Sequence, residues 1–278
     1  SDQVDASIVL AAQEVAEDVP VVSVVEEPDR TAYHRLAGAD DVLSPRPLLG
    51  RSLASKVTTS VTTDLDDVIE LGDEFEIVEL PIQRQSRLAG QTLAESGIRE
   101  TAGVNVIGAW FRGEFETPPD PEATITNGTV LLATGQERQL QEVEELTRSA
   151  VRRFERGSTV VVGHGQVGQT ITGALDDADI PYTVVDQVDG DGVDVVGDAT
   201  DPETLRALDI EDANSVVLAL PDDTTAEFAT LVARELNPQA EIVARAEEAQ
   251  SIPKMYRAGA DYVLSLATVS GRMIASTI

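Results

Sequence analysis

Residues 158–168 read STVVVGHGQVG, a run of β-branched residues followed at once by three glycines spaced as G-x-G-x-x-G. This order is typical of a buried strand that turns through a glycine loop into a helix. In such a turn Gly163 permits the tight bend, Gly165 lets a pyrophosphate approach the backbone, and Gly168 lets the helix pack closely on the strand. Backbone N–H groups from Gln166 onward would face the phosphates. The stretch predicts a nucleotide-binding α/β unit.

The residues after the glycine loop continue the pattern of a doubly wound parallel sheet. A helical pattern runs to about residue 175, and PYTVVD at 181–186 is typical of a second strand. Its last residue, Asp186, is placed to accept hydrogen bonds from a ribose 2′-OH, which favours NAD(H) or another adenine nucleotide over NADP. The rest of a six-stranded Rossmann unit is predicted as strands within 193–208, 215–223, 241–246 and 263–265, with helices at 226–236 and from about Val269.

Several side chains beyond the glycines are candidates for the same site. Asp198 follows the third strand, where it would reach an adenine or ribose or merely cap the turn, and Thr200 or Asp201 is expected to cap the next helix. Arg245 lies in the fifth strand and is expected to contact the nucleotide or a neighbouring carboxylate. The candidate nucleotide-binding residues are Gly163, His164, Gly165, Gln166, Val167, Gly168, Asp186, Asp198, Ala199, Leu220 and Arg245.

A phrase of this unit also occurs near the start of the chain. AGADDVLS at 37–44 matches AGADYVLS at 258–265, and an ungapped register of 221 residues keeps thirteen identities over 26–55. In each copy a helical pattern runs into a glycine that can take the left-handed conformation, and a short strand follows. The phrase is thus expected to be a packing junction without a ligand role. It indicates a duplicated fold unit, of which residues 1–56 are the C-terminal half.

The segment at 70–148 has a different texture and predicts a small α+β lobe, with linkers at 57–69 and 149–157. Its expected elements are a strand at 75–82, a short helix at 86–98, a strand, a turn near Gly113 and a proline-rich loop within 104–121, a strand at 127–135 and a charged helix from Glu137.

GHGQVG at 163–168, VVGDATDPETL at 195–205 and MYRAGADYVLSLATVSGRMIAS at 255–276 resemble the nucleotide-binding N-lobe (TrkA-N) of RCK domains, the Trk-type regulators of potassium conductance and uptake. The resemblance covers essentially all of 158–278. Leu88, Gly90, Leu93 and the strand from Asn127 through Gly128 and Thr129 to Val130 resemble the small C-lobe (TrkA-C) of the same family. The chain is therefore expected to be a fragment of a larger tandem protein.

The resemblance implies a cytoplasmic regulatory subunit or domain that gates a potassium channel pore or a Trk-type membrane subunit. It implies a homo-oligomer, either a dimer or a gating ring, whose dimer contact would use residues 269–276 unless they are intramolecular core. Some relatives carry an arginine in the glycine loop for ATP, and Gln166 in its place favours NAD(H) or ADP. Calcium-gated relatives have paired carboxylates after the fifth strand, but Arg245 stands at one of those positions beside Glu247, and Val24 at its repeat beside Glu26, so no metal site is predicted.

The charge of the chain limits its partners. Fifty Asp and Glu against twenty Lys and Arg give a net charge of −30, spread over the whole length. This surface would repel nucleic acid and anionic lipid, and it is typical of proteins from salt-accumulating halophiles. The absence of cysteine excludes disulfides and zinc–sulfur sites. No apolar run approaches the roughly 20 residues that span a bilayer.

The main alternative is an NAD-dependent oxidoreductase, because the same nucleotide fold serves both classes. That chemistry needs an acid or base beside the nicotinamide. The two histidines are His34, in the incomplete first unit, and His164, inside the glycine loop, and no Tyr-x-x-x-Lys pair occurs. No catalytic residue is therefore predicted, and ligand sensing is favoured over an enzyme. A purely structural assembly module would require an empty glycine loop.

Overall fold

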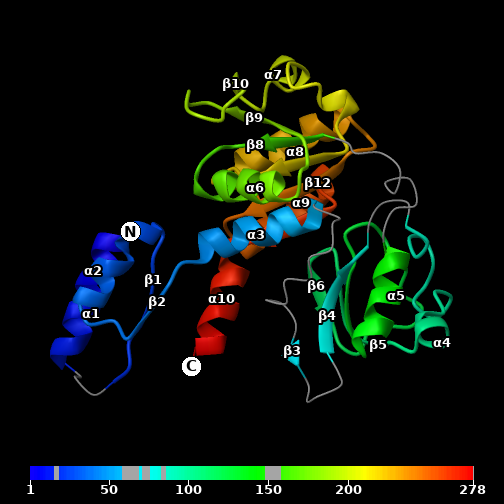
Figure 1. The fold of residues 1–278 in the computed structure, drawn as a ribbon, viewed down its shortest axis with the longest axis horizontal. Coiled ribbons are helices and arrows are strands. Elements are labelled where there is room, and N and C mark those ends of the chain that lie inside the picture. The colour runs from blue at the N-terminus through cyan, green and yellow to red at the C-terminus, as the bar shows by residue number, and fades with distance from the viewer. Residues whose placement is uncertain (16–18, 58–68, 71–75, 83–85, 148–157, 278) are drawn as a thin grey trace.

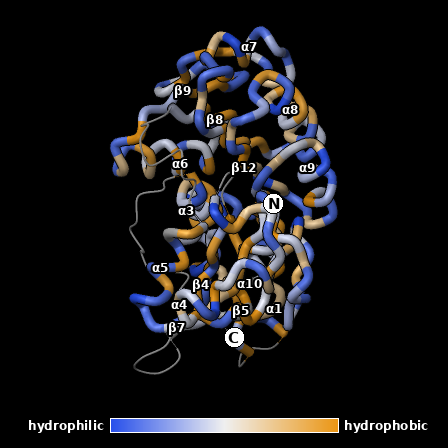
Figure 2. Tube along the Cα trace, turned by 90° about the vertical axis from the view of Figure 1, so that its right-hand side faces the viewer, coloured by the Kyte–Doolittle hydropathy of each residue, from blue (hydrophilic) through white to orange (hydrophobic). Residues whose placement is uncertain are grey.

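Three sheets organise the part of the chain that the structure describes (Figure 1). The computed structural model describes residues 1–15, 19–57, 69–70, 76–82, 86–147 and 158–277. The predicted linkers at 57–69 and 149–157 lie almost entirely outside these ranges. In Figure 2 the six-stranded lobe stands above the five-stranded lobe. No helix among the described residues is long and apolar enough to cross a membrane.

The Rossmann lobe, which begins at residue 158 and is also called the second lobe below, contains a parallel six-stranded sheet in the order β10-β9-β8-β11-β12-β13. Chain order reverses between β8 and β11, which is the doubly wound Rossmann arrangement that the sequence predicts. Its strands are β8 (Thr159–Val162), β9 (Tyr182–Asp186), β10 (Val195–Val196), β11 (Ser215–Leu218), β12 (Glu241–Ala246) and β13 (Tyr262–Ser265).

Helices cover both faces of this sheet, because successive strand residues point to opposite sides. Val160 and Val162 face one core, which packs under α7 (Pro202–Arg206), α8 (Asp223–Leu236) and α9 (Ile252–Ala258). Val161 faces the other core, under α6 (Gln166–Asp177) and α10 (Leu266–Thr277). The helices of this lobe begin a few residues earlier than predicted in two places, at Asp223 and Leu266. Short 3₁₀ turns lie at η2 (Ile210–Asp212) and η3 (Ala249–Ser251).

The first segment contributes a helix to that second core. It contains α1 (Asp2–Val15), β1 (Val22–Val24), η1 (Pro28–Arg30), α2 (Thr31–Leu36), β2 (Asp41–Leu43) and α3 (Pro45–Val57). Leu49, Leu53 and Val57 of α3 are buried with Val161 and Ile171. Helix α3 lies so close to α6 that a Cβ at Gly50 would come within 2.6 Å of Thr170 Cβ.

Helix α10 makes the reverse contact, because it packs on α3 and against β1 and β2. Val269, the start of the predicted dimer contact, is 9% exposed and belongs to the core of the chain itself. Each of the two last helices, α3 and α10, therefore packs against elements of the other copy.

The predicted glycine stops are confirmed in both copies, with Gly38 at φ 104° and Gly259 at φ 112°. A short parallel strand follows each of them. In the first copy that strand, β2, pairs with β1 over a small core of Val9, Ala37 and Ala39.

The small lobe is an antiparallel sheet in the order β3-β4-β7-β5-β6. Its elements are β3 (Ile69–Glu70), β4 (Glu76–Pro81), α4 (Ile98–Ala102), β5 (Asn105–Phe111), β6 (Glu114–Glu116), β7 (Val130–Gly135) and α5 (Glu137–Thr147). It docks on the Rossmann lobe through the Tyr262 hydroxyl, which donates to the Ile82 carbonyl at 2.9 Å. At Gly128 a Cβ would lie 2.1 Å from the Asp261 carbonyl oxygen, so only glycine fits there.

The predicted helix at 86–98 is wrong. Those residues form turns, and the short helix α4 begins only at Ile98. Gly90 has φ 90°, which a right-handed helix excludes. Thr92 and Glu95 hydrogen-bond to each other's backbone N–H, at 3.0 and 3.2 Å, and so fix a local turn instead.

Candidate nucleotide-binding site

A cavity of about 470 Å³ opens at the carboxyl ends of the parallel strands, where chain order reverses. This is the position at which open α/β sheets bind ligands. Nine of the eleven residues predicted from the sequence line it: Gly163, Gly165, Gln166, Val167, Asp186, Asp198, Ala199, Leu220 and Arg245.

The three loop glycines occupy three different environments. Gly163 has φ 94°, a conformation that a side chain would strain. A Cβ at Gly168 would lie 2.0 Å from the Gly163 carbonyl oxygen, so this glycine lets helix and loop touch without itself lining the cavity. Gly165 lines the cavity, and a Cβ built on it would meet no atom within 4 Å. Gly165 is therefore the point at which a ligand can approach the backbone.

Helix α6 begins directly after Gly165, and this N-cap residue contributes no side-chain hydrogen bond to the first turn. The first N–H groups of a helix have no partner within the helix, and their dipoles attract anions. Because Gln166 and Val167 of this turn line the cavity, the turn presents donors to an anionic group bound there.

Asp186 lines the cavity and also holds the loop in place. One of its carboxylate oxygens accepts from the His164 N–H at 2.6 Å, and the other accepts from the Val188 N–H at 2.9 Å. Each carboxylate oxygen has a second lone pair, so Asp186 can still accept from a ribose hydroxyl. The ring of His164 does not line the cavity and lies beside Gly192.

Asp198 lines the cavity and caps its own turn as well. Its Oδ1 accepts from the Thr200 hydroxyl at 2.7 Å and from the Thr200 N–H at 2.8 Å, and these hydrogen bonds lower the pKa of Asp198. The cap of α7 is Asp201, which accepts from the Glu203 N–H at 3.2 Å. Asp222 at the start of α8 has a lowered pKa for a like reason, hydrogen bonds from the Thr225 hydroxyl and N–H.

Two arginines, Arg245 and Arg46, line the same cavity as Asp186, Asp198 and Asp222. Arg245 has a side chain only 5% exposed and forms an ion pair with Glu247, while its Nε is buried without a hydrogen-bond partner among the described residues. Arg46 enters from the first segment and pairs with Glu27 and Glu26, at 3.1 and 3.4 Å. No group of three or more His, Asp or Glu that could hold a metal occurs within the described ranges.

Arg46 and Glu27 are lining residues that sequence reasoning missed. In the internal register they correspond to Ala267 and Glu248, which do not line the cavity. Only the exchange of α3 into the second lobe brings them to the glycine loop, and no local pattern signals that exchange. His34, the other histidine, is buried in the first segment on the Ser23 hydroxyl, at 2.8 Å.

Comparison with family models places two domains in the chain. The TrkA-N domain model matches residues 159–266, and the TrkA-C domain model matches residues 77–148.

Curated relatives include proteins named for potassium transport. Potassium channel protein 1 of Methanocaldococcus jannaschii is 31% identical over 126 residues, which are 42% of this chain and 38% of that one. Trk system potassium uptake protein TrkA homolog 2 of Methanosarcina mazei is 21% identical over 259 residues, 89% of this chain and 54% of that one. The chain thus spans about two-fifths to one-half of the length of these relatives.

Solved structures match over nearly the whole chain. The GsuK RCK domain is 33% identical with a TM-score of 0.73, and the match covers 99% of this chain and 59% of that one. A GsuK channel bound to NAD is 34% identical with a TM-score of 0.71, covering 99% of this chain and 50% of that one.

Proposed function

Residues 77–148 and 159–266 are a TrkA-C and a TrkA-N domain of the RCK type, and we propose that the chain is a nucleotide-sensing regulatory part of a potassium channel or Trk-type potassium transporter. The observation that carries the proposal is the cavity at the first turn of α6, where Gly165 leaves open space for a ligand. Relatives named as potassium channel and potassium uptake proteins support the second half of the proposal.

The residues of the cavity fit an adenine nucleotide with a pyrophosphate. Asp186 is available to a ribose, the α6 turn to phosphates, and the buried Arg245 Nε to a further acceptor. With Asp186 at the strand end and Gln166 in the glycine loop, NAD(H) and ADP fit better than NADP or ATP. The NAD-bound GsuK channel supports the same choice.

A ligand in this cavity would bias the arrangement of the lobes. The cavity walls belong both to the second lobe and, through Glu27 and Arg46, to the first segment. A ligand that binds one arrangement more tightly shifts the population toward it, and paired lobes in a homo-oligomer would pass that shift to a membrane pore or subunit. In this proposal residues 1–56 are half of a first N-lobe, 70–148 a C-lobe and 158–278 a complete second N-lobe at the cytoplasmic face of the membrane.

The test is the identity of any nucleotide released from the denatured protein, followed by calorimetric titration with NAD, NADH and ADP. Gly165→Asp should abolish binding, because the new carboxylate would enter the phosphate position. Gly173→Asp is the matched control, since Gly173 is exposed on the same helix and its Cβ would meet nothing within 4 Å. Equal binding by the Gly165→Asp variant would contradict the location of the site.

Two further measurements examine the function itself. Particle mass in molar KCl should correspond to at least a dimer, and a clean monomer would contradict the gating mechanism. Turnover of NADH with small carbonyl compounds would instead support an oxidoreductase on the same fold.

A further inference from the structure

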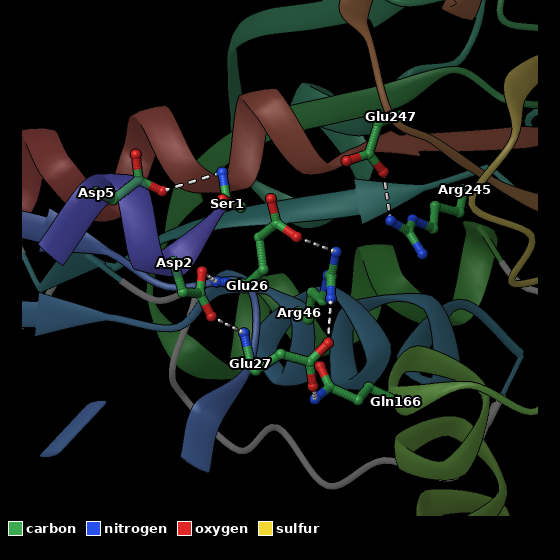
Figure 3. A network of polar contacts seen from close by, with 9 residues as sticks. All are labelled: Ser1, Asp2, Asp5, Glu26, Glu27, Arg46, Gln166, Arg245 and Glu247. Carbon is green, nitrogen blue, oxygen red and sulfur yellow. Dashed lines mark hydrogen bonds and ion pairs between the residues drawn. The ribbon is translucent and has the colours of Figure 1, made fainter. Parts of the chain in front are cut away.

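The wall of the cavity that comes from the first segment contains one cation and one anion. Arg46 is the second residue of α3, and Glu27 follows β1 (Figure 3). Among the described residues, they are the two from outside the Rossmann lobe that line the cavity. Any ligand role for them rests on the proposed nucleotide site, which they would couple to the first segment.

Glu27 joins the two parts of the chain. Its Oε1 accepts from Arg46 at 3.1 Å, and its Oε2 accepts from the side-chain amide of Gln166. Gln166 is the first residue of α6, and it lines the cavity together with Val167 of the same turn. One carboxylate therefore holds the start of α3 and the start of α6 together, as Figure 3 shows.

This arrangement leaves polar atoms unsatisfied. Arg46 Nε and Gln166 Oε1 are buried and have no hydrogen-bond partner among the described residues, and the same holds for Arg245 Nε. Leaving a buried donor or acceptor unpaired costs free energy. A phosphate group entering the cavity would offer acceptors to both guanidinium groups, which suit planar recognition of such oxygens.

Glu27 is at the same time an obstacle to that ligand. It places a negative charge beside the helix turn that would bind phosphate, and like charges at such distances repel. The carboxylate and a phosphate would compete for Arg46.

We propose that Arg46 is a phosphate-binding residue supplied by the first segment, and that Glu27 is the competitor which holds it until a nucleotide with a pyrophosphate binds. Binding transfers Arg46 from Glu27 to the phosphate and releases the Glu27 contact with Gln166. The nucleotide thereby changes the contact between the first segment and the second lobe. Adenosine, which has no phosphate group, leaves that contact intact.

The first test is calorimetric titration of the whole chain with ADP and with adenosine. Arg46→Gln should weaken ADP binding about tenfold and leave adenosine binding unchanged. Arg51→Gln is the matched control, because Arg51 is exposed on the same helix and loses the same charge. Arg46→Lys should give an intermediate loss, since it keeps the charge without the planar fork. Unchanged adenosine binding also shows that the Arg46→Gln variant is folded.

The second test uses a substitution that should change ADP affinity in the opposite direction. Glu27→Gln removes the competitor and should tighten ADP binding several-fold, without an effect on adenosine. Its control is Glu248→Gln, the equivalent position of the second copy, which does not line the cavity.

The outcomes separate this inference from the function it rests on. If the wild-type chain binds ADP but Arg46→Gln behaves as Arg51→Gln, the role of Arg46 is refuted and the nucleotide site stands. If Arg46→Gln weakens adenosine and ADP equally, Arg46 supports the fold of the site and not the phosphate, which also refutes the proposal. If the wild-type chain binds neither ADP nor NAD, both fail.

Discussion

The two copies of the duplicated unit, from α1 to α3 and from α8 to α10, use the same side chains to make the same backbone contacts. Asp2 accepts from the N–H groups of Glu26 and Glu27 at 2.8 and 3.1 Å. Its equivalent, Asp223, accepts from the N–H groups of Glu247 and Glu248 at 2.7 and 3.2 Å. A carboxylate at the start of each first helix thus fixes the end of the following strand.

The junction phrase repeats a second such contact. Asp40 accepts from the Val21 N–H at 2.7 Å, and Asp261 accepts from the Ile242 N–H at 2.9 Å. The duplicated sequence therefore preserves a set of hydrogen bonds that fix the first helix and the two strands of each copy relative to one another. These hydrogen bonds do not depend on a ligand.

The copies differ in how much surrounds them. Within the part of the chain that the structure describes, the second copy lies inside a six-stranded sheet, whereas the first forms a sheet of two strands. Tyr262 is 3% exposed, while Asp41 at the same place in the phrase is exposed. Ser23 and His34 form a polar pair where the second copy has Ala244 and Met255. The same local contacts should therefore contribute very different amounts of stability.

Exchanging the one residue that differs within the phrase should have the largest effect. Tyr262→Asp buries a carboxylate and removes the hydrogen bond to Ile82, so it should cost about 4 kcal/mol or more of unfolding free energy. Asp41→Tyr, at the exposed site, should change stability by about 0.5 kcal/mol or less. Urea denaturation monitored by circular dichroism measures both, and similar losses would contradict the difference in burial.

The shared carboxylate of the phrase should give the next largest difference. Asp261 is buried and also pairs with Arg234 at 2.7 Å, so Asp261→Ala should cost about 3 kcal/mol. Asp40 makes the equivalent hydrogen bond in an exposed position, and Asp40→Ala should cost about 1 kcal/mol. The same denaturation experiment applies. A larger loss for Asp40→Ala would mean that the first copy, and not the second, limits stability.

Much of the second lobe was predictable from the sequence because its signals are local. Gly163 and Gly259 are required by their own backbone angles, and the strands are short runs of β-branched residues. The failed helix at 86–98 shows the limit, since Gly90 takes a left-handed conformation there and the turn between Thr92 and Glu95 satisfies the backbone locally.

The first-segment wall of the cavity could not be predicted in the same way. Gln166 and Glu27 are 139 residues apart, and they meet because α3 packs in the core of the other copy. That packing depends on whether α3 or α10 covers a given part of the core. Because α3 and α10 are equivalent elements of the repeat, they are similar in sequence, and the sequence does not distinguish the two arrangements.

Breaking the polar pair of Ser23 and His34 in the first copy should cause a smaller loss of stability, which a second substitution should restore. Ser23→Ala leaves the buried His34 ring without its hydroxyl partner and should cost about 1–2 kcal/mol. Adding His34→Met reproduces the apolar pair of the second copy and should restore most of that loss, because both polar groups are then gone. Denaturation of the single and double variants measures the difference, and an additive loss would show that the first copy depends on His34 itself.

The smallest expected effect is a pH dependence of stability that comes from Asp2, at the start of α1 in the first copy. Burial raises the pKa of Asp2, but the hydrogen bonds from the N–H groups of Glu26 and Glu27, together with the charges of His34 and the N-terminus, lower the pKa overall. A carboxyl whose pKa is lower in the folded state stabilises the fold above its unfolded pKa, and the contribution disappears as pH falls through the folded value. The stability difference between the wild type and Asp2→Asn should therefore be constant near neutral pH and shrink below about pH 4. Urea denaturation across that range measures the difference, and a gap that persists at the lowest pH would mean that Asp2 acts through packing. Since Asp2 also positions the backbone of Glu27, the same variant should loosen the Glu27 contact with Gln166 and make ADP binding slightly tighter at neutral pH.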